Sequence, residues 1–309
     1  MRLGIFVGST GATTTLEDQI QQIVDAENDG FDSFWSAQVM GVDALTLIAL
    51  AGQRTRRIEM GTGVVPIFPQ HPLALAQHAL TAQAASGGRL TLGLGVAHKP
   101  TVEGRLGLEF DRPALRMREY LTVMRSLVET GSVEFSGEAY RVNAAIQVPS
   151  AMPFPILIAA LAPRMLRTAG ELAEGTVTWM TGRKTIETHI VPRINEAAEA
   201  AGRPRPRVCV AAPVAVTDDV PGTRRWAAEQ FHRYGQLPSY RRMLDIEGVD
   251  GPGDMAVLGN ETEVERQLRA YADAGATDFI STVLTVGGDS PDSSEKRTRE
   301  LLKSLLGKI

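Results

Sequence analysis

Residues 58–65 read Ile-Glu-Met-Gly-Thr-Gly-Val-Val, and residues 90–96 read Leu-Thr-Leu-Gly-Leu-Gly-Val. Both are short runs of strand length, and the segment between them has helical character from Pro72 to Ala85, with a proline in its first turn. A strand, a helix and a second strand in this order predict two parallel strands joined by a crossover helix. The stretch from 58 to 96 therefore indicates an α/β protein.

The same alternation continues along the chain. Eight strand-like runs are separated by segments of helical period, and we expect the strands at 3–7, 33–36, 58–65, 90–96, 155–160, 176–179, 208–216 and 278–283. Eight parallel units without a dinucleotide-binding fingerprint favour a closed (β/α)8 barrel, the TIM-barrel fold, in a single domain over 1–309. An open doubly wound sheet is the alternative.

Two segments exceed the regular alternation and are predicted to be insertions. After the fourth strand come a loop, a helix at 113–129 and an alternating segment, 133–142, whose turn at Ser136-Gly137 predicts a hairpin. After the seventh strand, 221–253 loosens into one or two helices and a Gly/Pro loop. The part from Trp226 to Gly253 is either an active-site lid or a surface elaboration.

The composition excludes several functional classes. Of the 309 residues, 43% are hydrophobic and 22% are charged, and 32 basic against 36 acidic side chains give a formal charge of -4. No positive field is therefore available for nucleic acid or anionic lipid, and no run approaches the roughly 18 to 20 apolar residues that span a bilayer. The lone cysteine, Cys209, sits in an apolar run and is expected to be a buried hydrophobe. We expect a cytoplasmic protein whose partner is a small molecule.

In a barrel, the chemistry lies in the loops that follow the strands. Gly61 and Gly63 end the third strand, where they either let the backbone approach a planar ligand or form a plain β-bulge. Pro163 begins a helix directly after the fifth strand, so free backbone N–H groups there either bind an anion or simply allow tight packing. Trp179 ends the sixth strand, either as core or as a cofactor wall.

Only one of the five histidines falls on this face. His98 directly follows the fourth strand and is the candidate for ligand contact and for proton transfer. His71 precedes a helix and is expected to have a positional or packing role, whereas His189 and His232 are expected to be exposed on helices. No metal-ligand cluster, Gly-x-Ser-x-Gly elbow or phosphate-loop motif is present in the sequence. The lack of a well-placed acid, base or nucleophile favours an enzyme whose cofactor carries the chemistry.

These motifs resemble the luciferase-like family of flavin- and deazaflavin-dependent oxidoreductases. The likeness covers nearly the whole chain and is strongest at 55–64, His71-Pro72 and 86–95, with further matches at 30–35 and 160–166. The segment 104–113, Gly-Arg-Leu-Gly-Leu-Glu-Phe-Asp-Arg-Pro, is most similar to the branch that uses the deazaflavin coenzyme F420. The resemblance therefore implies F420 as the cofactor, with flavin mononucleotide (FMN) as the alternative, and a homodimer by analogy only.

The resemblance also implies the residues of the site. A non-prolyl cis peptide would join Gly63 and Val64 and support the ring system. Catalytic roles fall on His98 and Gln38. Contacts with the ring fall on Gln38, Gly63 and Val64, and contacts with the polar tail fall on Val96, Ala97, His98, Ala160, Leu161, Ala162 and Met180.

One departure from the family concerns the end of the second strand. Relatives that oxidise sugar phosphates or alcohols look to have an acid followed by a histidine there, whereas this chain has Gln38-Val39. No base then stands ready to take a hydroxyl proton, which argues against alcohol oxidation.

The resulting hypothesis is that reduced deazaflavin donates hydride from its central ring to an activated double bond or carbonyl of a small, mostly apolar substrate. The proton would come from solvent, from the cofactor or from His98. A luciferase-like monooxygenase that uses reduced FMN is the first alternative. A non-catalytic flavin- or deazaflavin-binding protein and a cofactor-free barrel isomerase are the others.

Overall fold

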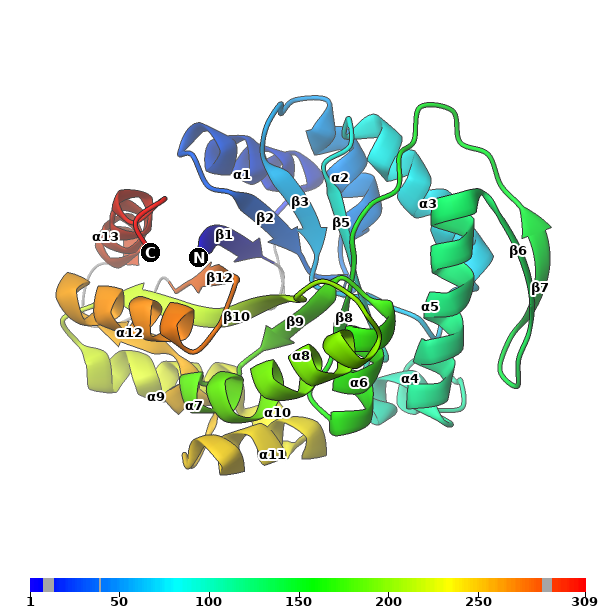
Figure 1. Cartoon of the computed structure of the whole chain (residues 1–309). Helices are drawn as coiled ribbons and strands as arrows, with labels where there is room; N and C mark the ends of the chain where they lie inside the picture. Colours follow the sequence, from blue (N-terminus) through cyan, green and yellow to red (C-terminus); the bar gives the residue numbers. More distant parts are fainter. Residues whose placement is uncertain (8–13, 39, 285–290) are drawn as a thin grey trace.

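The computed structural model describes residues 1–7, 14–38, 40–284 and 291–309, and its centre is a closed parallel barrel (Figure 1). Each barrel strand pairs in parallel with the next, and the last pairs with the first. In order around the ring, the strands are β1 (Arg2–Val7), β2 (Ser33–Ser36), β3 (Glu59–Thr62), β5 (Leu90–Gly95), β8 (Ile156–Ala159), β9 (Gly175–Trp179), β10 (Arg207–Val216) and β12 (Asp278–Val283). The (β/α)8 barrel is thus confirmed, and the open sheet is excluded.

Helices pack around the outside of this sheet (Figure 1). The main ones are α1 (Leu16–Asn28), α2 (Ala44–Gly52), α3 (Pro72–Ala85), α5 (Pro113–Thr130), α6 (Pro163–Leu172), α8 (Val191–Ala200), α12 (Glu261–Asp273) and α13 (Pro291–Ser304). Thr15, Asp43 and Asn260 cap three of them, because each side chain accepts a backbone N–H of the first turn. His71 Nδ1 accepts the Leu73 N–H at 3.2 Å, which confirms the positional role expected for this histidine.

The third strand differs from its expected form. A continuous strand over 58–65 was predicted, but β3 ends at Thr62, a cis peptide joins Gly63 to Val64, and β4 (Val65–Pro66) pairs separately with β5. Where the ladder is interrupted, Thr62 Oγ1 accepts the Gly93 N–H at 2.8 Å and donates to the Gly93 carbonyl at 2.9 Å. The expected cis peptide is confirmed, and two short strands replace the single one that was expected.

Both predicted insertions are present. The first contains α4 (Lys99–Gly104), α5 and an antiparallel hairpin of β6 (Ser132–Ser136) and β7 (Arg141–Ala145), which projects from the barrel in Figure 1. The second contains α9 (Val220–Gln230), α10 (His232–Gln236), α11 (Pro238–Glu247) and a 3-10 turn, η2 (Pro252–Met255). A short strand, β11 (Val257–Gly259), then pairs with the end of β10. The second insertion therefore starts and ends beside the carboxyl end of β10.

The amino-terminal end of the barrel is filled by charged side chains. Arg207 lies 3.0 Å from Glu59 and 2.7 Å from Asp278, and Arg2 contacts both carboxylates. Burial alone would raise the pKa of Asp278, but the hydrogen bonds and charge of Arg207 outweigh it and hold that pKa below its usual range. Ion pairs therefore close this end of the barrel, and each of these charged side chains has an oppositely charged partner.

The middle of the barrel is filled by Trp35, whose side chain is fully buried. Gly61 makes room for it, since a Cβ at that position would lie 2.3 Å from the indole ring. Cys209 is buried in the same cluster and acts as the small hydrophobe that was expected. Space for a ligand inside the barrel is therefore left at the carboxyl ends of the strands.

Candidate active site

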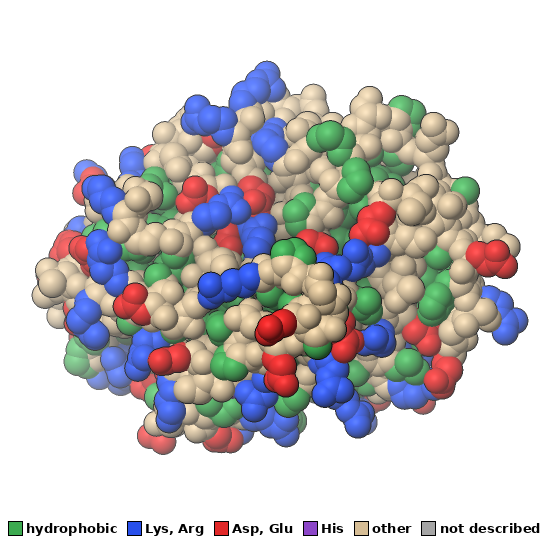
Figure 2. Space-filling view, in the orientation of Figure 1, with side chains coloured by type: hydrophobic (Ala, Val, Ile, Leu, Met, Phe, Trp, Pro, Cys, Tyr) green, Lys and Arg blue, Asp and Glu red, His purple; other side chains and the backbone are tan. Residues whose placement is uncertain are grey.

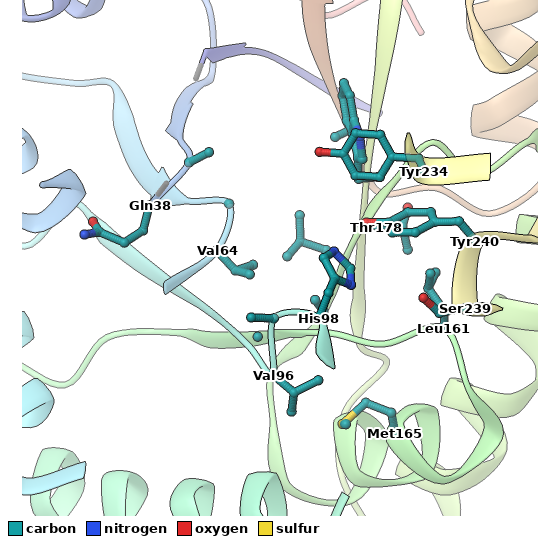
Figure 3. Close-up of a pocket in the computed structure, with 18 of the residues that line it drawn as sticks. Gln38, Val64, Val96, His98, Leu161, Met165, Thr178, Tyr234, Ser239 and Tyr240 are labelled. Atoms are coloured by element: carbon teal, nitrogen blue, oxygen red, sulfur yellow. The ribbon is translucent and has the colours of Figure 1, made fainter. Parts of the chain in front are cut away.

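A cavity of about 310 Å³ opens at the carboxyl ends of the barrel strands. This volume lies at the lower end of the range typical of small-molecule sites. Most of the residues predicted for the cofactor line it (Figure 3), namely Gln38, Gly63, Val64, Val96, Ala97, His98, Leu161 and Ala162. The residues that the sequence reasoning did not assign to the site are Phe6, Ala37, Gly95, Ala159, Met165, Val177, Thr178, Ala211, Tyr234, Ser239 and Tyr240.

Two predicted cofactor residues do not line the cavity. Ala160 is fully buried in the outer core, because side chains alternate along a strand and its neighbour Ala159 already faces inward. Met180 packs with Phe231 and Leu244 under the second insertion, with only 2% of its surface exposed. The side chains of Ala160 and Met180 therefore lie outside the cavity lining, and a contact of these residues with the cofactor stays a prediction.

Two glycines, Gly63 and Gly95, leave the floor of the cavity nearly free of side chains. A Cβ at Gly63 would lie 2.8 Å from Phe6, and a Cβ at Gly95 would lie 2.4 Å from a methyl group of Val64. The cis peptide between Gly63 and Val64 runs across this floor. Backbone and one small aliphatic side chain form a shallow surface on which a flat ring system fits. Gly63 thus lies where the sequence placed it, at the cavity, and its contact with a planar ligand stays a prediction.

His98 faces the cavity from the loop after β5. It is the N-cap of α4, but its side chain makes no capping hydrogen bond. Burial lowers the pKa of His98, so the ring is neutral at physiological pH. The preceding Ala97 has a left-handed φ of 56°, which is uncommon for a residue other than glycine and recurs at functional sites.

Gln38 lines the edge of the cavity but has a second, structural contact. Its Oε1 accepts the N–H of Ala44 at 2.7 Å, at the start of α2. An amide does not titrate, and this oxygen already accepts one hydrogen bond, so the NH2 group is the part of the side chain with both donors left for a ligand. Val39, the other residue of the departure from the family, lies outside the described residues.

The walls are aromatic and uncharged. Trp179 lies 5.5 Å from Phe6 and 6.1 Å from Tyr234 between ring centroids, so it serves both as core and as cavity wall. The lining contains no Asp, Glu, Lys or Arg within the described parts of the chain. Charged side chains of both signs are spread over the outer surface instead, as the face in Figure 2 illustrates. Thr178 Oγ1 is buried and has no hydrogen-bond partner among the described residues.

The second insertion supplies one wall of the cavity, through Tyr234 on α10 and through Ser239 and Tyr240 on α11. Sequence reasoning left open whether this segment is a lid or a surface elaboration, and its location favours a role at the site. The sequence signal that could have identified this wall is the presence of two tyrosines in an insertion that follows the carboxyl end of a barrel strand.

His189 was expected to be exposed, and this is wrong. It is buried, and its Nε2 donates to the carbonyl of Leu161 at 2.7 Å. The segment before α8 forms α7 (Arg183–Thr185) and a π-helical turn, η1 (Ile186–Ile190), in which His189 is buried together with Ile186 and Ile190. Burial lowers the pKa of His189. The histidine therefore holds the Leu161 segment of the cavity wall.

Within the described ranges, no group of three or more His, Cys, Asp or Glu side chains could hold a metal ion. None of the described helices is long and apolar enough to cross a membrane.

A parallel barrel with a cavity at the carboxyl ends of its strands, lined in the described part of the chain by uncharged residues, is the architecture of a barrel enzyme. Comparison with known proteins gives the family. The model of the luciferase-like monooxygenase family matches residues 1–304, and the chain belongs to this family of oxidoreductases.

Three known proteins are informative neighbours. A Mycobacterium tuberculosis protein, assigned by its name to the coenzyme F420-dependent oxidoreductases, is 30% identical over 91% of this chain and 95% of its own. The F420-dependent tetrahydromethanopterin reductase of Methanopyrus kandleri shares the fold with a TM-score of 0.78, at 23% identity over 99% of this chain and 98% of that one. The oxygenating component of 3,6-diketocamphane monooxygenase from Pseudomonas putida, solved with FMN, has a TM-score of 0.74 at 18% identity over 100% and 98%.

Proposed function

We propose that the chain is a coenzyme F420-dependent oxidoreductase that transfers a hydride between reduced deazaflavin and a small, mostly apolar substrate with an activated C=C or C=O bond. The Mycobacterium tuberculosis relative supports this cofactor, because the likeness spans nearly the whole of both chains. The observation that carries the proposal is the shallow floor at Gly63, Val64 and Gly95, which suits a flat ring.

The chain's own residues would bind and orient the cofactor. Gly63, Val64 and Gly95 would lie against the ring plane. Leu161 and Ala162 lead into α6, whose first backbone N–H groups suit the anionic tail of the coenzyme, which is one of the two roles that the sequence left open for this helix start. When bound, the reduced deazaflavin supplies the hydride. The protein supplies orientation and exclusion of water, which lower the barrier without a charged catalytic group.

His98 is the candidate for holding a proton in this site. Its neutral ring carries one N–H donor and one acceptor nitrogen, so it can pass a proton between solvent and the cavity. Gln38 is an orienting rather than an acid–base group, because its amide does not ionise.

FMN is the second cofactor candidate, and with it a monooxygenase activity, since the Pseudomonas putida enzyme has the same fold. A non-catalytic cofactor-binding protein is the candidate from another class. The homodimer and the cytoplasmic location remain predictions from the sequence and do not enter the proposal.

A paired titration tests the proposal. The purified protein is titrated with coenzyme F420 and, separately, with FMN, and quenching of each cofactor's fluorescence gives two dissociation constants. We expect tighter binding of F420. Preference for FMN would make the monooxygenase the leading candidate, and binding of neither cofactor would remove the proposal.

A further inference from the structure

Two tyrosines of the second insertion face the cavity opposite the cofactor floor. The rings of Tyr234 and Tyr240 lie 5.0 Å apart, and that of Tyr240 lies 5.8 Å from His98, between centroids. Figure 3 shows that both hydroxyl groups point from the α10–α11 side toward the cavity. Tyr240 Oη has no hydrogen-bond partner within the described part of the chain, so this donor is directed at a site rather than at the protein.

We propose that Tyr240 Oη donates a hydrogen bond to the carbonyl oxygen of the substrate, and that this substrate is a flat, uncharged, conjugated aldehyde or ketone. The inference rests on the proposed F420-dependent function and assigns a substrate-binding role to the insertion. Of the two tyrosines, Tyr234 lies among the rings of Trp179 and Phe231 and acts as a wall, whereas Tyr240 lies beside His98.

The walls determine the substrate class. Aromatic rings at Phe6, Trp179, Tyr234 and Tyr240 favour a planar molecule that stacks or packs edge-on. Away from the start of α6, which is assigned to the coenzyme tail, a phosphate or carboxylate of the substrate would lose its hydration and find no cationic side chain among the described lining residues. A neutral carbonyl needs only one donor, and Tyr240 provides it.

The state of Tyr240 suits this role. Burial raises the pKa of Tyr240, so its hydroxyl remains a protonated donor throughout the physiological range. When hydride from the reduced deazaflavin adds to the β-carbon of a conjugated carbonyl, a C–H bond forms, the C=C π bond breaks, and the electron pair moves onto oxygen. A hydrogen bond already aimed at that oxygen becomes stronger as the negative charge develops, and the proton that completes the product comes from solvent.

Isotope-edited infrared spectroscopy tests the contact. The protein is loaded with oxidised F420, and trans-cinnamaldehyde labelled with 13C at the carbonyl is added as the probe. We expect the bound C=O stretch to move to lower wavenumber than in apolar solvent. In Tyr240→Phe the shift should be lost and the dissociation constant of the probe should rise by about tenfold, as for loss of one hydrogen bond.

Two further variants make the result specific. Tyr120→Phe is the matched control, because its buried hydroxyl has no partner among the described residues and lies on α5, outside the cavity. It should keep the full carbonyl shift. Tyr234→Phe decides which hydroxyl is the donor, and loss of the shift there but not in Tyr240→Phe would overturn the assignment.

The dissociation constant of F420 is measured for each variant and should be unchanged. Normal F420 binding with an unshifted carbonyl in the wild-type protein would overturn this inference alone. Failure of F420 to bind at all would remove the proposed function and this inference together.

Discussion

Replacing Gly95 with alanine tests the cofactor floor most directly. The new Cβ would lie 2.4 Å from Val64 Cγ2, whereas ordinary contacts begin at 3.4 Å, so the Val64 side chain must move by about 1 Å. Its free direction is into the cavity that it lines. The displaced methyl group then occupies space that the flat ring needs, and overpacking of this size costs about 1–3 kcal/mol. We expect the dissociation constant of F420 to rise by about 5- to 150-fold.

The fold should tolerate this change, because Val64 relaxes into empty space when no ligand is bound. We expect the free energy of unfolding to fall by less than about 1 kcal/mol. Gly93→Ala is the contrasting variant. The new Cβ would lie 2.0 Å from the backbone oxygen of Thr62, and because this backbone atom is fixed in the sheet, the substitution should destabilise the fold. Gly251→Ala, with nothing within 4 Å, is the neutral control.

Fluorescence titration with F420 and urea denaturation measure the two quantities separately. Wild-type affinity in a well-folded Gly95→Ala protein would refute the location of the ring on this floor. A loss of stability as large as that of Gly93→Ala would instead show that Val64 cannot relax into the cavity.

Three further predictions concern buried ionisable groups. Asp278→Asn should lower the free energy of unfolding by about 3–5 kcal/mol, because Arg207 loses a buried partner. Since the folded pKa of Asp278 is depressed, its contribution is present above about pH 4 and is lost as pH falls through that folded value, which urea denaturation across pH will measure. NMR titration should give His98 a pKa below 6.5, because burial disfavours its charged form. The neutral ring then contributes its full stability above pH 6.5, and this contribution declines as the pH falls below that value. A normal or raised pKa would contradict the burial of the His98 ring. His189→Leu removes the hydrogen bond to Leu161 and should weaken F420 binding by about tenfold while leaving kcat unchanged; an equal loss in kcat would argue against a positioning role.

The strand order and the cofactor floor could be predicted from sequence because both depend on local signals. Barrel strands are short β-rich runs bounded by helices, and Gly63-Val64 sits within a recognisable segment. The exposed position expected for His189 is wrong. Ile186, His189 and Ile190 share one helix face by their i, i+3, i+4 spacing, and that face is buried in the core. Ala160, which the resemblance assigns to the coenzyme tail, has its side chain in the outer core because side chains alternate along a strand, and its contact with the cofactor stays a prediction.

The tyrosines of the cavity wall were missed for a different reason. Tyr234 and Tyr240 stand in a segment of weak periodicity, and only the return of the chain from β10 to β11 brings them over the barrel. Their proximity to His98 depends on contacts between residues more than a hundred positions apart, which no single-sequence pattern records.

The cavity takes some of its lining from the strand ends and some from the second insertion, and the polar groups of the two parts favour different reactions. Forming an alcohol from a carbonyl, or the reverse, requires a proton to move at oxygen, and the side chain at the end of β2 is an amide whose oxygen is engaged with Ala44. Reducing a C=C bond conjugated with a carbonyl requires at oxygen only a hydrogen bond, because the proton can reach carbon from solvent. Under the proposed function, Tyr240 meets the second requirement, and Gln38 does not meet the first. Under the proposed function, conjugated C=C reduction therefore needs no acid–base group at oxygen, whereas alcohol chemistry would have to use His98 for that proton.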